Sequence, residues 1–264
     1  MTATSNDLPD TLPRTALVTG AGARLGRAIA AALGEDGFAV AIHYNGSAKG
    51  AEETAAVIRA AGGRAAVVQA DLSDPAAAKS LLAEAEAVIG PVGVLANSAS
   101  AFDKDALGDL SPATFRKLLD VNALAPVLLT QAFAKRLPAA ATGVVVNMLD
   151  VQLAAPSHAF FSYSCSKAAL EIATRMSALE LAPRIRVNGV APGLVLRSGA
   201  QTQEGYLARQ ALTPMGQGLG PADIVRAVRY LIRSPHVTGE VMAVDSGQSL
   251  LGFGNSRISG KALD

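Results

Sequence analysis

The sequence predicts an α/β fold, namely a single-domain Rossmann fold in which a doubly wound parallel sheet of about seven strands is covered by helices on both faces. Short apolar runs alternate with helical segments along the whole chain, as they do in such sheets. The first run leads through a glycine-containing turn into a helix, an arrangement that points backbone N–H groups at a pyrophosphate. No repeat or linker divides the 264 residues, of which 50% are hydrophobic.

The predicted strands are apolar runs bounded by glycine, proline or polar residues, which is typical of strands buried inside a sheet. They cover residues 15–19, 38–44, 65–69, 92–96, 143–148, 184–190 and 240–244.

The first helices are predicted in the intervals between these strands. One covers residues 27–33 and is expected to stop at Gly34, and the next covers residues 50–61. Asp74 followed by Pro75 predicts an N-cap with proline at the first helical position.

The second half of the chain contains three further predicted helices. Ser111, again followed by proline, caps a long helix that carries Asn122 within an apolar stretch. Asn122 therefore either satisfies a break in that helix or belongs to a site. Residues 163–181 form the next helix, and Pro221 starts the last one. The apolar face of the last helix consists of Ile224, Ala227, Val228 and Leu231.

The domain is predicted to cover residues 15–264. Residues 1–14 are mostly polar, lack the apolar core of a secretion signal and are expected to form a flexible N-terminal tail. Residues 194–217 show little periodicity and are expected to form a substrate lid.

Composition excludes several classes of partner. The net charge is +1, from 23 basic and 22 acidic side chains, and no basic block favours nucleic acid or an anionic membrane. No apolar run is long enough to span a bilayer. The single cysteine indicates a reducing compartment, so we expect a cytoplasmic protein. The three histidines lack metal-ligand spacing, and no metal site is expected.

The strongest candidates for chemistry are Tyr163 and Lys167, which are four residues apart and so share one face of a helix. A lysine ammonium one turn away is expected to lower the pKa of the phenol and fit the pair for acid–base work. Asp150 follows the strand at residues 143–148 and is expected at the mouth of the sheet. The Tyr/Lys spacing alone is a weak signal, because an ordinary surface helix shows it too.

The glycine turn and the second strand indicate a nucleotide cofactor. Gly20 permits the tight turn, and Gly26 lets the following helix pack on the strand. NAD-selective sites carry an acidic residue near the end of the second strand, whereas this chain has Tyr44, Asn45, Gly46 and Ser47. The missing carboxylate, with Arg24 and Ser47 as phosphate ligands, favours NADPH.

These residues are expected to meet at one rim, because ligands of open parallel sheets bind beyond the carboxyl ends of the strands. Gly20, Arg24, Asn97, Asp150 and Pro192 each follow a predicted strand.

On these motifs the chain resembles the short-chain dehydrogenase/reductase family over nearly its whole length. Within that family it is most similar to the pteridine reductases and the related dihydromonapterin and dihydrofolate reductases. Arg24, Leu25 and Gly26 stand where the wider family usually has a further glycine, and Asp150 stands where most members have a catalytic serine. Residues 98–102 resemble the pteridine reductase element that lines the pterin slot. The other matching pieces are Thr19, Asp71, the Asn97-Ser98-Ala99 element, Asn122, Tyr163, Lys167, Pro192, Gly193 and the terminal Val-Asp-Ser-Gly.

The resemblance implies a set of site residues. Catalysis would involve Asp150, Tyr163, Lys167 and Asn122. NADPH would be bound by Gly20, Arg24, Leu25, Gly26, Tyr44, Asn45, Ser47, Asp71, Leu72, Asn97, Ser98, Ala99, Tyr163, Lys167, Pro192 and Gly193. The substrate would be bound by Arg24, Ser100, Phe102, Asp150, Tyr163 and Leu194. The sequence departs from the family at Ser98, where a second asparagine is usual, and at residues 45–47, where pteridine reductases have His-Arg-Ser.

The implied reaction is hydride transfer from NADPH to the C=N bond of a pterin or dihydrofolate. Lys167 would hold the nicotinamide ribose, and Asn122 would support a water behind it. Tyr163 would pass the proton with Asp150 as its source or orienter, and Phe102 would stack the flat ring. The family also implies a homotetramer. A ketone or 3-oxoacyl reductase and a non-catalytic NADPH-binding regulator remain as alternatives; Asp150 counts against the first, and the proton relay against the second.

Overall fold

The computed structural model describes residues 8–154, 156, 159–197 and 201–251. Its centre is a seven-stranded, wholly parallel sheet in the order β3-β2-β1-β4-β5-β6-β7, which confirms the predicted fold class. The chain runs outward from β1 to β3 and then returns to place β4 beside β1, so the order reverses between these two strands. The strands are β1 (Thr15–Val18), β2 (Ala39–Tyr44), β3 (Ala65–Gln69), β4 (Val94–Asn97), β5 (Gly143–Met148), β6 (Ile185–Pro192) and β7 (Val241–Val244).

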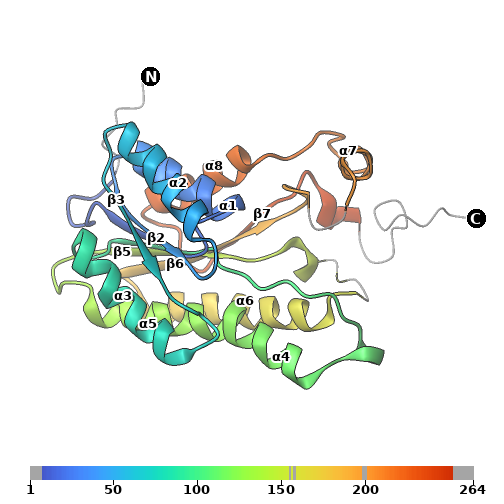
Figure 1. Cartoon of the computed structure of the whole chain (residues 1–264), viewed down its shortest axis with the longest axis horizontal. Helices are drawn as coiled ribbons and strands as arrows, with labels where there is room; N and C mark the ends of the chain where they lie inside the picture. The colour runs from blue at the N-terminus through green and yellow to red at the C-terminus, as the bar shows by residue number, and fades with distance from the viewer. Residues whose placement is uncertain (1–7, 155, 157–158, 198–200, 252–264) are drawn as a thin grey trace, which may run out of the picture.

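Helices cover both faces of this sheet (Figure 1). One face carries α1 (Arg24–Glu35), α2 (Ala48–Ala60) and α8 (Pro221–Arg233). The other carries α3 (Pro75–Ile89), α4 (Pro112–Leu119), α5 (Ala125–Arg136) and α6 (Phe161–Leu181). The predicted long helix with Asn122 is α4 and α5 joined by a π-helical turn, η2 (Asp120–Leu124).

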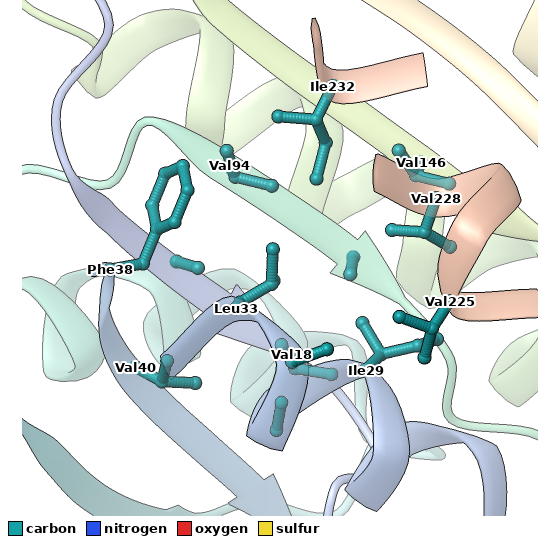
Figure 2. Packing of buried hydrophobic residues seen from close by; sticks show 14 of the residues in the cluster. Val18, Ile29, Leu33, Phe38, Val40, Val94, Val146, Val225, Val228 and Ile232 are labelled. Carbon is teal, nitrogen blue, oxygen red and sulfur yellow. The ribbon is translucent and has the colours of Figure 1, made fainter. Parts of the chain in front are cut away.

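Apolar strand residues point alternately into two cores. Val18, Val40, Val94 and Val146 pack with Ile29 and Leu33 of α1 and with Val225, Val228 and Ile232 of α8 (Figure 2). Their chain neighbours Leu17, Ala41, Leu95 and Val145 pack on the opposite face, against α3 and α5. Burial of both faces explains why the sequence shows continuous apolar runs here.

Helix α1 differs from its predicted span at both ends. It begins at Arg24 and continues through Gly34 to Glu35. A Cβ at Gly34 would lie 2.7 Å from Ile58 Cγ2 of α2, so this glycine permits close helix packing and does not end the helix. The chain turns at Gly37, whose φ of +85° lies in the left-handed region that glycine favours.

Two segments expected to be irregular are partly ordered by packing. Leu8 and Leu12 are buried in the core and the Thr142 N–H donates to the Thr11 carbonyl, whereas the side chains of residues 9–11 are exposed. Residues 1–7 of the expected tail lie outside the described residues. The expected lid at residues 194–217 contains helix α7 (Gln203–Ala211); its residues 198–200 lie outside the described part.

Across the residues that the structure describes, no helix combines the length and apolar character needed to cross a membrane.

Candidate active site

A cavity of about 790 Å³ opens beyond the carboxyl ends of the strands, within the size range of small-molecule and cofactor sites. The loops after β1, β3, β4, β5 and β6 all contribute to its wall, as expected from the strand order. The expected site residues that line it are Gly20, Arg24, Leu25, Gly26, Asn45, Asp71, Leu72, Ser98, Ala99, Ser100, Phe102, Asp150, Tyr163, Lys167, Pro192, Gly193 and Leu194.

Four expected site residues are not part of the cavity wall: Tyr44, Ser47, Asn97 and Asn122. Ser47 is the N-cap residue of α2, and its side chain makes no capping hydrogen bond. Asn97 is buried within the sheet, where its amide donates to Asn147 Oδ1 at 2.8 Å. Asn97 therefore joins β4 to β5, and its own Oδ1 is buried without a hydrogen-bond partner.

Asp150 and Tyr163 form the polar centre of the cavity. The Tyr163 hydroxyl donates to Asp150 Oδ2 at 2.8 Å, and the Gln152 N–H donates to Asp150 Oδ1 at 2.8 Å. Asp150 follows β5 and caps a short 3-10 turn, η3 (Val151–Leu153), whereas Tyr163 lies in the first turn of α6. The two side chains meet because β5 ends and α6 begins at the same rim of the sheet.

Lys167 lies one turn after Tyr163 and is buried. Its ammonium donates to the Met148 carbonyl at 2.8 Å and lies 5.7 Å from the centroid of the Tyr163 ring. Burial lowers the pKa of Lys167 to about 8, against the opposing attraction of Asp150. The side chain is therefore mostly cationic at neutral pH.

The pKa of Tyr163 is not lowered, contrary to the expectation from its spacing with Lys167. Burial raises it well above its ordinary value, and the Asp150 carboxylate raises it further. The carboxylate lies in direct hydrogen-bond contact with the phenol, whereas the ammonium is committed to a backbone carbonyl. Burial also raises the pKa of Asp150, against hydrogen bonds from Gln152 and Tyr163. Near neutral pH Tyr163 keeps its proton and can donate it.

Asn122 holds the loop after β4 to the catalytic helix. Its amide group donates to the Ala101 carbonyl at 2.9 Å and to Ser166 Oγ at 3.0 Å. Its oxygen accepts from the Ala101 N–H at 2.8 Å and from the Ser100 hydroxyl at 3.2 Å. These bonds use both donors and both lone pairs of the amide, so the side chain of Asn122 has no group left for the expected water.

Phe102 lies beside Tyr163 at the cavity. Their rings meet edge to face with centroids 4.6 Å apart, and Phe102 stacks on Phe160 at 4.5 Å. Phe102 is 46% exposed, so it is not a core residue and has a free surface for a flat ligand. Phe160 was not identified from the sequence, because its position depends on the left-handed conformation (φ +62°) just before α6.

The loop from Gly20 to Gly26 fits a dinucleotide phosphate. A Cβ at Gly20 would lie 2.8 Å from Ala99 Cα, and one at Gly26 would lie 2.4 Å from the Gly20 carbonyl oxygen. The residue before α1, Ala23, supplies no side-chain cap, and the first turn holds no acidic residue. The first-turn N–H groups and the positive end of the helix dipole thus have no competing protein anion there.

His43 also belongs to the cavity wall, although sequence reasoning considered the histidines only as metal ligands. Its Nδ1 accepts from the Gly20 N–H at 3.1 Å, and its Nε2 lies 3.1 Å from the Ala70 carbonyl oxygen. Burial lowers the pKa of His43, which favours the neutral ring that this pairing requires. A polar residue inside the apolar strand β2 was the available sequence signal.

Comparison with known proteins agrees with this geometry. The family model described as short chain dehydrogenase matches residues 14–205. Pteridine reductase 1 of Leishmania tarentolae is 36% identical over 280 residues, covering 89% of this chain and 96% of the relative. A 3-oxoacyl-[acyl-carrier-protein] reductase of Staphylococcus aureus is 29% identical over 241 residues, covering 89% and 98%. The crystal structure of FolM alternative dihydrofolate reductase 1 from Brucella canis, complexed with NADP, superposes on this structure with a TM-score of 0.86. Its sequence is 40% identical, and the match covers 89% of this chain and 94% of that chain.

Proposed function

The chain belongs to the short chain dehydrogenase family of oxidoreductases, and within it we propose an NADPH-dependent reductase of a C=N bond in a pterin or dihydrofolate. The observation that carries this proposal is the hydrogen bond from Tyr163 to Asp150 at 2.8 Å. A carboxylate at this place suits a ligand with N–H donors, such as the amino-pyrimidinone edge of a pterin, because charge-assisted hydrogen bonds are strong. The same carboxylate would repel a carbonyl oxygen unless it were protonated.

In the proposed reaction, each of the polar and aromatic residues at the cavity has a separate role. When bound, the nicotinamide cofactor supplies the hydride, which is added to the ring carbon of the C=N bond. Tyr163 gives its hydroxyl proton to the adjacent ring nitrogen, and solvent then returns a proton to the phenolate, either directly or through the Asp150 carboxyl group. Lys167 contributes a buried positive charge that favours the transient phenolate, and Phe102 holds the flat ring over the site.

The preference for NADPH over NADH rests on the end of β2. No acidic residue stands between Tyr44 and Ser47 to repel a phosphate on the adenosine ribose. Arg24 lines the cavity, begins α1 and donates through its guanidinium to the Arg197 carbonyl at 3.0 Å, and we assign this guanidinium to that phosphate. The Brucella structure, which holds NADP, supports the same assignment by analogy.

A ketone or 3-oxoacyl reductase is the second candidate, favoured by the similarity to the Staphylococcus aureus enzyme. A panel of dihydropterins, dihydrofolate, ketones and 3-oxoacyl thioesters, each assayed with NADPH and NADH, separates the two. We expect the highest kcat/KM for a dihydropterin or dihydrofolate with NADPH. A higher value for a ketone or thioester would replace the proposal, and no turnover of any compound would favour the non-catalytic regulator.

The homotetramer remains a proposal supported by one exposed apolar surface. On α6, Ile172, Met176 and Leu179 are 55%, 65% and 86% exposed, and Leu124 of η2 and Val127 of α5 are also exposed. Contiguous apolar side chains of this kind mark association surfaces. Light scattering at micromolar concentration should give a tetramer, and a monomer would refute the assembly.

A further inference from the structure

The catalytic helix α6 has no capping side chain of its own. The residue before it, Phe160, is in the left-handed region and makes no side-chain hydrogen bond to the first turn. The first N–H groups of a helix lack partners within the helix, and a buried end needs them supplied from elsewhere. Tyr163 stands in this first turn, so the way these groups are satisfied bears on where its hydroxyl lies.

Asp105 supplies the missing partners from the loop that follows β4. One carboxylate oxygen accepts from the Ser162 N–H at 3.0 Å, and the other accepts from the Ser162 hydroxyl. Its backbone carbonyl also accepts from the Phe161 N–H at 3.3 Å. Asp105 and Ser162 are both buried, and a negative charge at a helix N-terminus interacts favourably with the helix dipole.

The same loop carries Phe102, three residues before Asp105. Asn122 anchors the loop at Ala101, and Asp105 anchors it to α6. Phe102 thus lies between two fixed points, and its ring is held edge to face against Tyr163. The anchor at Asp105 joins the element that would hold the substrate ring to the element that donates the proton.

We propose that Asp105 is a positioning residue of this active site: by capping α6 from the loop that carries Phe102, its carboxylate fixes the separation of Phe102 and Tyr163. It does not line the cavity and touches no reacting atom. A small error in the placement of reacting groups can cost a hundredfold in rate, so this anchor has a kinetic effect beyond its effect on stability. Since the effect is on hydride transfer, the proposal rests on the proposed function.

The test compares Asp105→Ala with a capping aspartate that is away from the proton relay. Asp74 caps α3 by accepting the Ala76 N–H at 2.8 Å, so Asp74→Ala removes the same kind of bond. Both variants should lower the melting temperature, but only Asp105→Ala should lower kcat at saturating cofactor, by roughly tenfold to a hundredfold. Asp105→Asn should recover most of the rate, because asparagine ranks with aspartate as a helix cap. The Kd for NADPH should be unchanged in Asp105→Ala, since the glycine loop is untouched.

Equal kcat in Asp105→Ala and Asp74→Ala would overturn the proposal and leave Asp105 as a structural cap. If the wild-type protein turns over no substrate, the proposed function fails, and the positioning role of Asp105 is then tested by crystal structures in place of kinetics. Crystals of Asp105→Ala and wild type with NADPH should then differ in the contact between the Phe102 and Tyr163 rings. An unchanged ring contact and first turn of α6 would equally overturn the positioning role.

Discussion

Asp150→Asn is the substitution that tests the proton relay most closely. In the wild-type site Asp150 accepts two hydrogen bonds, from the Gln152 N–H and from the Tyr163 hydroxyl, each at 2.8 Å. Asparagine has one acceptor oxygen and one NH₂ donor. Because the backbone fixes the Gln152 N–H, the amide oxygen should take that position and the NH₂ should face Tyr163. The phenol would then accept where it formerly donated, and residue 150 could no longer return a proton to it.

The expected loss follows from the size of general acid–base effects. These contribute roughly 10²–10⁴-fold to rate, which corresponds to about 3–5 kcal/mol in the activation free energy. A second effect acts in the same direction, because Asp150 raises the pKa of Lys167 against burial. Without the carboxylate that pKa falls below its present value of about 8, and Lys167 carries less positive charge at neutral pH.

Single-turnover oxidation of NADPH, followed by nicotinamide absorbance, measures the step directly, and cofactor fluorescence gives the Kd for NADPH. We expect Asp150→Asn to lose rate within the stated range with a normal Kd. Asp150→Ser, which introduces the residue usual in the wider family, should favour ketones over pterins. Unchanged pterin turnover in Asp150→Asn with normal NADPH affinity would remove Asp150 from the mechanism.

Three further results are expected. Phe102→Ala should raise KM for a pterin up to about tenfold, since an aromatic contact contributes about 0.5–1.5 kcal/mol. Calorimetry should show little change in melting temperature, because the Phe102 side chain is 46% exposed. A large drop in melting temperature, with weaker binding of both the pterin and NADPH, would make Phe102 a core residue. The reduction rate should fall as pH rises through about 8, because Lys167 loses its proton there and with it the positive charge that favours the phenolate; a flat pH–rate profile across this value contradicts the relay. Arg24→Gly should raise the free energy of unfolding by about 1 kcal/mol, because φ is +53° at this residue and glycine adopts that conformation without strain. The same substitution should reduce the preference for NADPH over NADH roughly tenfold, because the cation that binds the phosphate is lost. An unchanged ratio of kcat/KM for NADPH and NADH would exclude Arg24 as the phosphate ligand.

The parts of this protein that could be predicted are those set by local pattern. Strands β1 to β7 are recognisable because a parallel strand buried on both faces is a continuous apolar run. The proximity of Tyr163 and Lys167 follows from helical spacing, and Asp150 follows from its place after β5. The capping of α3 by Asp74 was predicted for the same reason, since the N-cap and the proline after it are adjacent in sequence.

The parts that could not be predicted depend on contacts between distant segments. The raised pKa of Tyr163 results from burial and from the distance to Asp150, neither of which spacing reveals. Asp105 caps a helix that starts far along the chain, and the sequence around it gives no sign of this partner. Gly34 is similar to a stop signal in sequence but is a helix-packing residue, because Ile58 lies against it.

Reduction of a C=N bond with hydride from NADPH, with Tyr163 protonating the neighbouring nitrogen, is the activity that we propose for this protein. Its most direct test uses NADPH deuterated at the nicotinamide carbon that transfers hydride, incubated with a dihydropterin, with the product analysed by mass spectrometry and NMR. We expect one deuterium on the ring carbon and a solvent-exchangeable proton on the adjacent nitrogen. A product without deuterium at that carbon, together with deuterium transfer to a ketone under the same conditions, would contradict it.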